Sequence, residues 1–176
     1  SGITDERLTS GGDERRYLLT VPEGYDGTTP LPVVFALHSL TVNYTIVPAL
    51  SGFDAMAEGY DVIGVSPSGF LEPTPYWIAA PVEPNRDLTF LLDLLDHLEA
   101  ELCVDLTRVF STGLSNGGQM SSLLACRASD RITAVAPVAG IEFAAGCNGE
   151  PVPVMAFHGD ADPVVPYEGG GLDAAT

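Results

Sequence analysis

The sequence contains no lysine: its 7 basic residues are all arginine, against 24 aspartate and glutamate residues. The net charge of −17 opposes binding to nucleic acid or to an anionic membrane surface. No apolar run approaches the roughly 18 residues that a membrane-spanning helix needs. The composition therefore indicates a globular protein with neither kind of partner. Its acidic surface either aids solubility or favours an uncharged substrate.

Cysteine is also scarce, with only Cys103, Cys126 and Cys147 present. Three cysteines allow one disulfide and leave one thiol over. Cys126 closes an apolar helical segment and Cys147 follows an apolar strand soon after, which favours pairing these two. Three buried free thiols are the alternative.

Apolar runs typical of buried strands alternate with stretches of helical spacing. We expect strands at 16–21, 31–38, 61–65, 108–112, 132–138 and 152–158, helices at 50–60, 87–103 and 117–128, and a loop at 71–86. This alternation predicts one domain over residues 1–176, an α/β fold with a doubly wound, mostly parallel sheet. The chain stops in a glycine-rich loop, so we expect a C-terminal strand and helix to be missing and the domain to be incomplete there.

The segment Gly113-Leu114-Ser115-Asn116-Gly117 matches the pattern G-x-S-x-G between an apolar strand and a helix. In that setting the two glycines permit a sharp turn that lifts a nucleophilic serine above the sheet edge. The Asn116 N–H then lies at a helix N-terminus, where it can stabilise a developing oxyanion. We interpret Ser115 as a nucleophile, and the alternative is a serine that only caps the helix.

Two further segments complete this interpretation. The loop after the strand at 31–38 supplies the second oxyanion donor of such a site, and we assign it to the backbone N–H of Leu40, with Ser39 as the alternative. His38 is interpreted as a residue that shapes this loop. A carboxylate after the strand at 152–158 lies where the acid of a catalytic triad belongs, and Asp162 is favoured over Asp160.

The strings RVFSTGLSNGGQMSSLLACRASDRITAVAPVAG and PVPVMAFHGDADPVVPYEGG, together with LPVVFALHS, resemble one branch of the α/β-hydrolases. That branch contains polyhydroxybutyrate depolymerases, feruloyl esterases, acetylxylan esterases and LpqC-like lipoproteins. The resemblance implies ester hydrolysis through an acyl-enzyme, no metal or organic cofactor, and a secreted or extracytoplasmic setting. It carries over Ser115 as nucleophile, Asp162 as acid, and the amides of Leu40 and Asn116 as oxyanion hole. Ser39 departs from the glycine that the family usually has there.

The catalytic histidine of that family lies downstream of the acid, beyond Thr176. The histidines present are His38, His97 and His158, and none lies where a base for Ser115 is expected. Three explanations compete: a C-terminal segment lost or present as a separate chain, a degenerate homologue that binds without cleaving, and rescue by His158.

An acyl pocket is expected between the loops 39–48 and 71–86. Tyr44, Tyr76 and Trp77 are candidates to stack on an aromatic or polymeric acid, and for Tyr76 and Trp77 the alternative is that they anchor their loop. The residues do not choose among polyhydroxyalkanoate, feruloylated or acetylated polysaccharide and aromatic polyester. A non-catalytic binding protein and a peptidase of the same fold are the rival functions.

Overall fold

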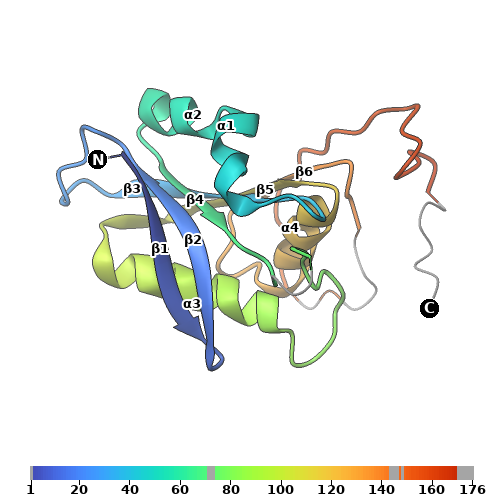
Figure 1. Ribbon diagram of the computed structural model, residues 1–176, viewed down its shortest axis with the longest axis horizontal. Coiled ribbons are helices and arrows are strands. Elements are labelled where there is room, and N and C mark those ends of the chain that lie inside the picture. Colours follow the sequence, from blue (N-terminus) through green and yellow to red (C-terminus); the bar gives the residue numbers. More distant parts are fainter. Residues whose placement is uncertain (1, 71–73, 143–146, 148, 170–176) are drawn as a thin grey trace.

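The computed structural model describes residues 2–70, 74–142, 147 and 149–169, and a six-stranded mixed sheet forms its centre (Figure 1). The strands are β1 (Gly2–Ser10), β2 (Asp13–Val21), β3 (Leu31–Leu37), β4 (Ile63–Pro67), β5 (Val104–Leu114) and β6 (Ala134–Val138), in the order β1-β2-β4-β3-β5-β6. The four strands β4, β3, β5 and β6 run parallel. The hairpin β1–β2 joins their edge in antiparallel fashion.

Helices pack on both faces of this sheet (Figure 1). They are the 3-10 helix η1 (Tyr44–Ile46), α1 (Val47–Ser51), α2 (Phe53–Tyr60), α3 (Arg86–Glu101) and α4 (Asn116–Arg127). Strand β3 serves both faces, because its side chains alternate. Val33 and Phe35 join the large core under α3 and α4, whereas Ala36 packs against Val47 and Phe53 on the other face. The doubly wound, mostly parallel sheet expected from the sequence is confirmed.

Strand β1 was not expected, because its residues are mostly polar and exposed. A signal for it exists in Gly11-Gly12, which have φ angles of +57° and +90° and connect β1 to β2. Two such residues between strands are typical of a tight hairpin. Gly52, at φ +67°, likewise divides the helix expected at 50–60 into α1 and α2.

The segment 152–158 lies beside β6 but is not a continuous strand. Among the described residues, its strand-type pairing with the sheet consists of two isolated parallel bridges, Val135 with Val154 and Val138 with Phe157. Pro153 explains part of this, because proline has no N–H to donate to a strand ladder.

Part of the sheet face on the side of α1 is left exposed and apolar. Along β5, Val109 and Ser111 are buried toward α4, whereas Phe110 and Thr112 are half-buried and Leu114 is 51% exposed. The neighbouring segment adds Met155 and Phe157, which are 67% and 51% exposed. These residues of β5 and of the segment 152–158 together form the exposed β5 face.

Candidate active site

The chain turns sharply at Ser115, between the end of β5 and the start of α4. Ser115 has φ 55° and ψ −118°, a backbone conformation that residues with a side chain rarely adopt. Such strain persists only where the surroundings hold it, and it occurs most often at functional sites. Here the Ser115 N–H donates to Val138 O at 2.8 Å.

Glycines surround this turn because the backbone segments touch. A Cβ on Gly117 would lie 2.3 Å from Leu37 O, and one on Gly113 would lie 2.5 Å from the Gly117 carbonyl carbon. Sequence reasoning missed Gly140, where a Cβ would lie 2.1 Å from Ser115 O. Its signal was available as a glycine directly after the strand at 132–138.

The loop after β3 is built around a buried His38. Its Nε2 accepts from the Gly69 N–H at 2.8 Å, so its Nδ1 carries the proton and donates to Ser39 O at 2.9 Å. Burial lowers the pKa of His38, which keeps the ring neutral. Both ring nitrogens are therefore used in shaping the loop, and neither is available as a base.

The half-buried side chain of Asn116 is bonded to the Trp77 backbone. Its Oδ1 accepts from the Trp77 N–H at 2.6 Å, and its Nδ2 donates to Trp77 O at 3.0 Å. The backbone N–H of Asn116 belongs to the first turn of α4, where no preceding helical carbonyl can accept it.

The aromatic residues considered for substrate binding have structural contacts instead. Trp77 is 2% exposed and its Nε1–H donates to His38 O at 3.0 Å. Tyr44 is 3% exposed and its hydroxyl donates to Asp5 at 3.1 Å. Their burial leaves neither ring a free face for stacking. Tyr76 is half-buried and packs edge-to-face against Phe70.

Asp162 lies in an acid loop, defined here as residues 158–165. Its Oδ1 accepts from the Val164 and Val165 N–H groups at 2.8 and 3.0 Å, which lowers the pKa of the carboxyl. His158 Nε2 donates to Val165 O at 2.7 Å and lies 3.8 Å from Asp162 Oδ2. Within the described residues, the recorded hydrogen bonds and ion pairs of Asp162 stay inside this loop, and none reaches Ser115.

A cavity of about 300 Å³ opens beside the turn. Its lining is apolar and comes from β3, the loop after it, α1 and the ends of β5 and β6, including Leu37, Val42, Leu50, Leu114 and Val138. The expected loop 39–48 contributes to it, whereas the expected loop 71–86 does not.

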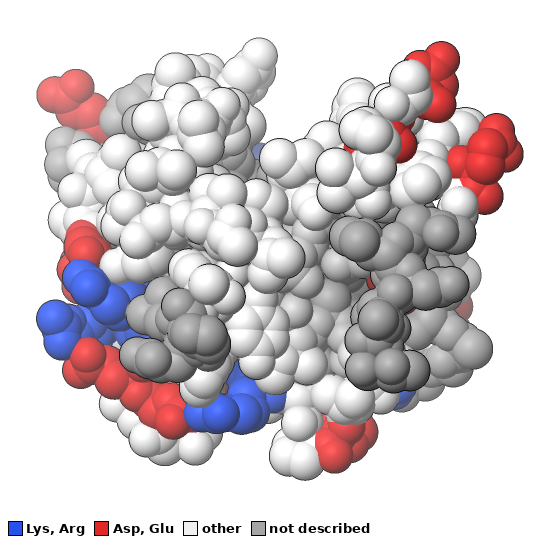
Figure 2. All heavy atoms as spheres, turned by 45° about the vertical axis from the view of Figure 1, so that its right-hand side comes forward, with Lys and Arg blue, Asp and Glu red and all other residues white. Residues whose placement is uncertain are grey.

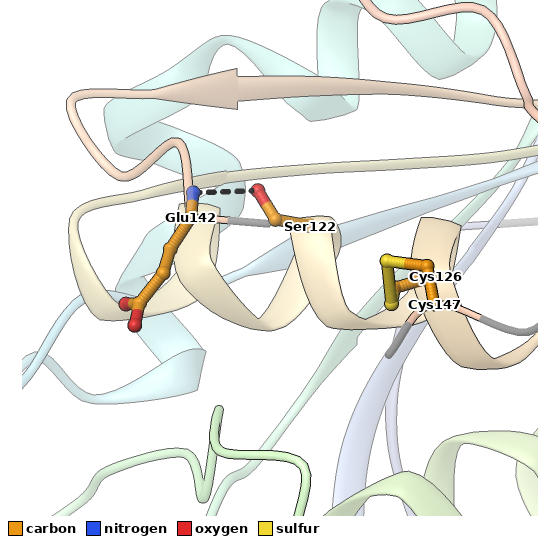
Figure 3. The surroundings of a disulfide bond; sticks show 4 residues. All are labelled: Ser122, Cys126, Glu142 and Cys147. Atoms are coloured by element: carbon orange, nitrogen blue, oxygen red, sulfur yellow. Dashed lines mark hydrogen bonds between the residues drawn. A yellow bond between two sulfur atoms is a disulfide. The ribbon is translucent and has the colours of Figure 1, made fainter. Parts of the chain in front are cut away.

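A disulfide joins Cys126 of α4 to Cys147 (Figure 3). Near it, Ser122 of the same helix accepts from the Glu142 N–H at 3.3 Å (Figure 3). These contacts hold the chain that leaves β6 against α4. Cys103 has a free thiol that lies 3.3 Å from Thr28 O.

Across the described ranges, no cluster of three or more His, Cys, Asp or Glu side chains is arranged to hold a metal ion. No helix in those ranges has the length and apolar character needed to cross a membrane.

The mixed sheet and the strained serine between β5 and α4 are those of the α/β-hydrolase fold. Solved structures share the fold. An acetyl xylan esterase from Aspergillus awamori matches with a TM-score of 0.75 at 15% identity, covering 94% of this chain and 76% of that one. A thermostable esterase matches with a TM-score of 0.71 at 21% identity, covering 95% and 49%.

Sequence relatives make the assignment more specific, although no protein-family model matches the chain. Feruloyl esterase C of Emericella nidulans is 35% identical over 174 residues, covering 93% of this chain and 62% of the relative. Probable feruloyl esterase C of Aspergillus terreus is 34% identical, covering 89% and 58%. Over most of its length the chain is thus similar in sequence to feruloyl esterases, and it spans about 60% of the length of these relatives.

Proposed function

We propose that this chain is the nucleophile-bearing part of a serine ester hydrolase. Ser115 Oγ attacks the ester carbonyl carbon, the alcohol leaves, and water then releases the acid from the acyl-enzyme. The strained backbone of Ser115 carries this proposal, because a turn that is costly in free energy serves to present its side chain. The Asn116 and Leu40 amides stabilise the oxyanion, and Asp162 orients the base.

The base itself comes from residues outside 1–176. Within the chain, His38 uses both ring nitrogens and His158 donates to Val165 O. His97 lies on α3 and packs edge-to-face against Tyr17. The relatives are longer than this chain, which leaves room for a further histidine. The same further part of the protein covers the exposed β5 face, since apolar surface favours burial.

A fluorophosphonate probe on the full-length protein tests the nucleophile. We expect labelling that maps to Ser115 and is lost in Ser115→Ala, while Ser129→Ala in the loop after α4 leaves it intact. Residues 1–176 alone should react far more slowly, because an unassisted serine hydroxyl is a poor nucleophile. Unlabelled full-length protein would favour a binding protein on a hydrolase fold.

For the substrate, we propose an ester of an aromatic acid on an uncharged polymer. The feruloyl esterases among the relatives support an aromatic acid as the acyl group of the substrate. The net charge of −17 supports an uncharged polymer as the part that carries this acyl group. In the view of Figure 2 the middle of the surface is largely uncharged, and both acidic and basic side chains lie at its margins. Methyl ferulate should be cleaved faster than acetylated xylan or polyhydroxybutyrate, and faster than the matching amide.

We also propose an extracytoplasmic location. The Cys126–Cys147 disulfide supports it, because disulfides persist in oxidising compartments. Mass spectrometry of the protein from its native host, with free thiols alkylated before reduction, tests whether this bond forms there.

A further inference from the structure

Trp77 connects two segments that are far apart in the sequence. Its indole N–H donates to His38 O at 3.0 Å, in the loop after β3. Its backbone N–H and C=O form a pair of hydrogen bonds with the Asn116 side chain, at 2.6 and 3.0 Å. One residue therefore contacts both segments that carry the proposed oxyanion donors. In Figure 1 the segment around residue 77, in green, lies beside α4.

The contacts to the loop after β3 orient two successive peptide groups. In a trans peptide the C=O and the N–H point in opposite directions, and both of these peptides are trans. Trp77 holds the carbonyl of His38, which sets the direction of the Ser39 N–H. His38 Nδ1 holds the carbonyl of Ser39, which sets the direction of the Leu40 N–H. Both candidate donors are thus oriented by a buried side chain.

Trp77 is itself held in place. The His38 ring lies against the indole, with ring centroids 4.9 Å apart. The next residue, Ile78, donates its N–H to Asp87 Oδ2 at 2.8 Å and accepts from Asn85 Nδ2 at 2.7 Å. Asp87 is fully buried and paired with Arg15 at 2.6 Å. The indole N–H thus projects from a fixed backbone.

We propose that Trp77 is a positioning residue that fixes the loop at 38–40 relative to the helix start at Asn116, and thereby sets the geometry of the oxyanion hole. The inference rests on the proposed ester hydrolysis. It assigns Trp77 no contact with substrate, in keeping with its burial. Misplacing catalytic groups by about 1 Å can cost as much as about 100-fold in rate.

The test uses Trp77→Phe in the full-length protein, which removes the indole N–H and keeps an apolar ring. We expect kcat on methyl ferulate to fall by about 10- to 100-fold with KM changed less than about threefold. Affinity for a boronic acid that forms a tetrahedral adduct should fall by a similar factor, and affinity for ferulate should not. Leu98→Val, on the core-facing side of α3, is the control for loss of packing and should leave kcat unchanged.

Amide hydrogen exchange without substrate provides a second measurement. Exchange in residues 38–42 should accelerate in Trp77→Phe and stay unchanged in Leu98→Val. Unchanged exchange, or faster exchange with full kcat, would overturn the positioning role. A raised KM with an unchanged kcat would also overturn the positioning role, because a lost contact between Trp77 and the substrate would then explain the effect.

A second variant keeps the test valid if Trp77→Phe does not fold. Asn116→Ala removes both hydrogen bonds to the Trp77 backbone while leaving the Asn116 N–H in place, and it should lower kcat in the same way. Ser115→Ala separates this inference from the proposed function. If that variant hydrolyses esters as fast as the parent protein, Ser115 is not the nucleophile and the proposed function fails at that point, whereas the exchange measurement still tests the contact of Trp77 with the two segments.

Discussion

The turn at Ser115 and the acid loop carry two parts of one proposed machinery, but the structure holds them in opposite ways. Around Ser115 the neighbouring backbone leaves no space for a Cβ on Gly117, and the supporting side chains His38 and Trp77 are buried. In the acid loop Val164 is 58% exposed, and among the described residues the hydrogen bonds of Asp162 stay within that loop.

Residues 1–176 therefore hold the proposed oxyanion donors in a fixed geometry, but they do not fix the acid loop in the same way. The segments with the proposed oxyanion donors are fixed by contacts between residues far apart in the sequence, such as Trp77 and Asn116. The acid loop follows the segment 152–158, which pairs with the sheet at two isolated bridges and contributes to the exposed β5 face. We infer that the acid loop reaches its working geometry only when the rest of the protein packs there.

The largest effect is expected at the buried ion pair behind Trp77. Asp87→Asn keeps an acceptor for the Ile78 N–H but leaves Arg15, only 5% exposed, as a buried charge without a carboxylate partner. Breaking such a pair costs about 3–5 kcal/mol of unfolding free energy. Urea denaturation measures it.

The matched control for this variant is Glu14→Gln, which breaks the exposed pair of Glu14 with Arg7 and should cost less than about 1 kcal/mol. Equal, small losses in the two variants would mean that water reaches Arg15 and that the segment around Trp77 is not rigid.

The same glycine substitution in both regions tests the comparison directly. Gly117→Ala puts a Cβ 2.3 Å from Leu37 O and should lower the unfolding free energy by about 3 kcal/mol. Gly159→Ala in the acid loop meets its nearest atoms at 4.0 Å and should change it by less than about 0.5 kcal/mol. Thermal and urea unfolding of both variants measure these free energies. Similar losses in the two variants would contradict the proposed difference between the turn at Ser115 and the acid loop.

These regions also differ in how far the sequence predicted them. The turn was readable, because G-x-S-x-G between a strand and a helix is a local pattern. The buried ion pair was not, because Arg15 and Asp87 are 72 positions apart and charged residues are usually solvated. For Trp77 the sequence offered anchoring of its loop as an alternative to substrate stacking, but nothing near it in sequence indicates that it contacts His38 and Asn116.

A smaller effect is expected from the protonation of His38. Burial holds its pKa in the folded state below the unfolded value of about 6.5, so only the unfolded state gains a proton as the pH falls below that value. Stability is therefore lost below pH 6.5, by at most about 1.4 kcal/mol per pH unit. Comparing urea denaturation of the parent protein and His38→Gln between pH 7 and pH 5 isolates this slope, since His97 and His158 are common to both. Parallel curves would mean that His38 is solvated.

The smallest effect is expected in the acid loop, where titration should change only local structure. The Val165 and Val164 N–H groups lower the pKa of Asp162 in the folded state, so their bonds persist above the unfolded value of about 3.9 and are lost as the pH falls through the lower folded value. The NMR amide shifts of Val164 and Val165 should therefore titrate with a midpoint below 3.9. Asp162→Asn should abolish that step and Asp160→Asn should not. A midpoint at or above 3.9 would show that the loop lacks even this local order, which would sharpen its contrast with the turn at Ser115.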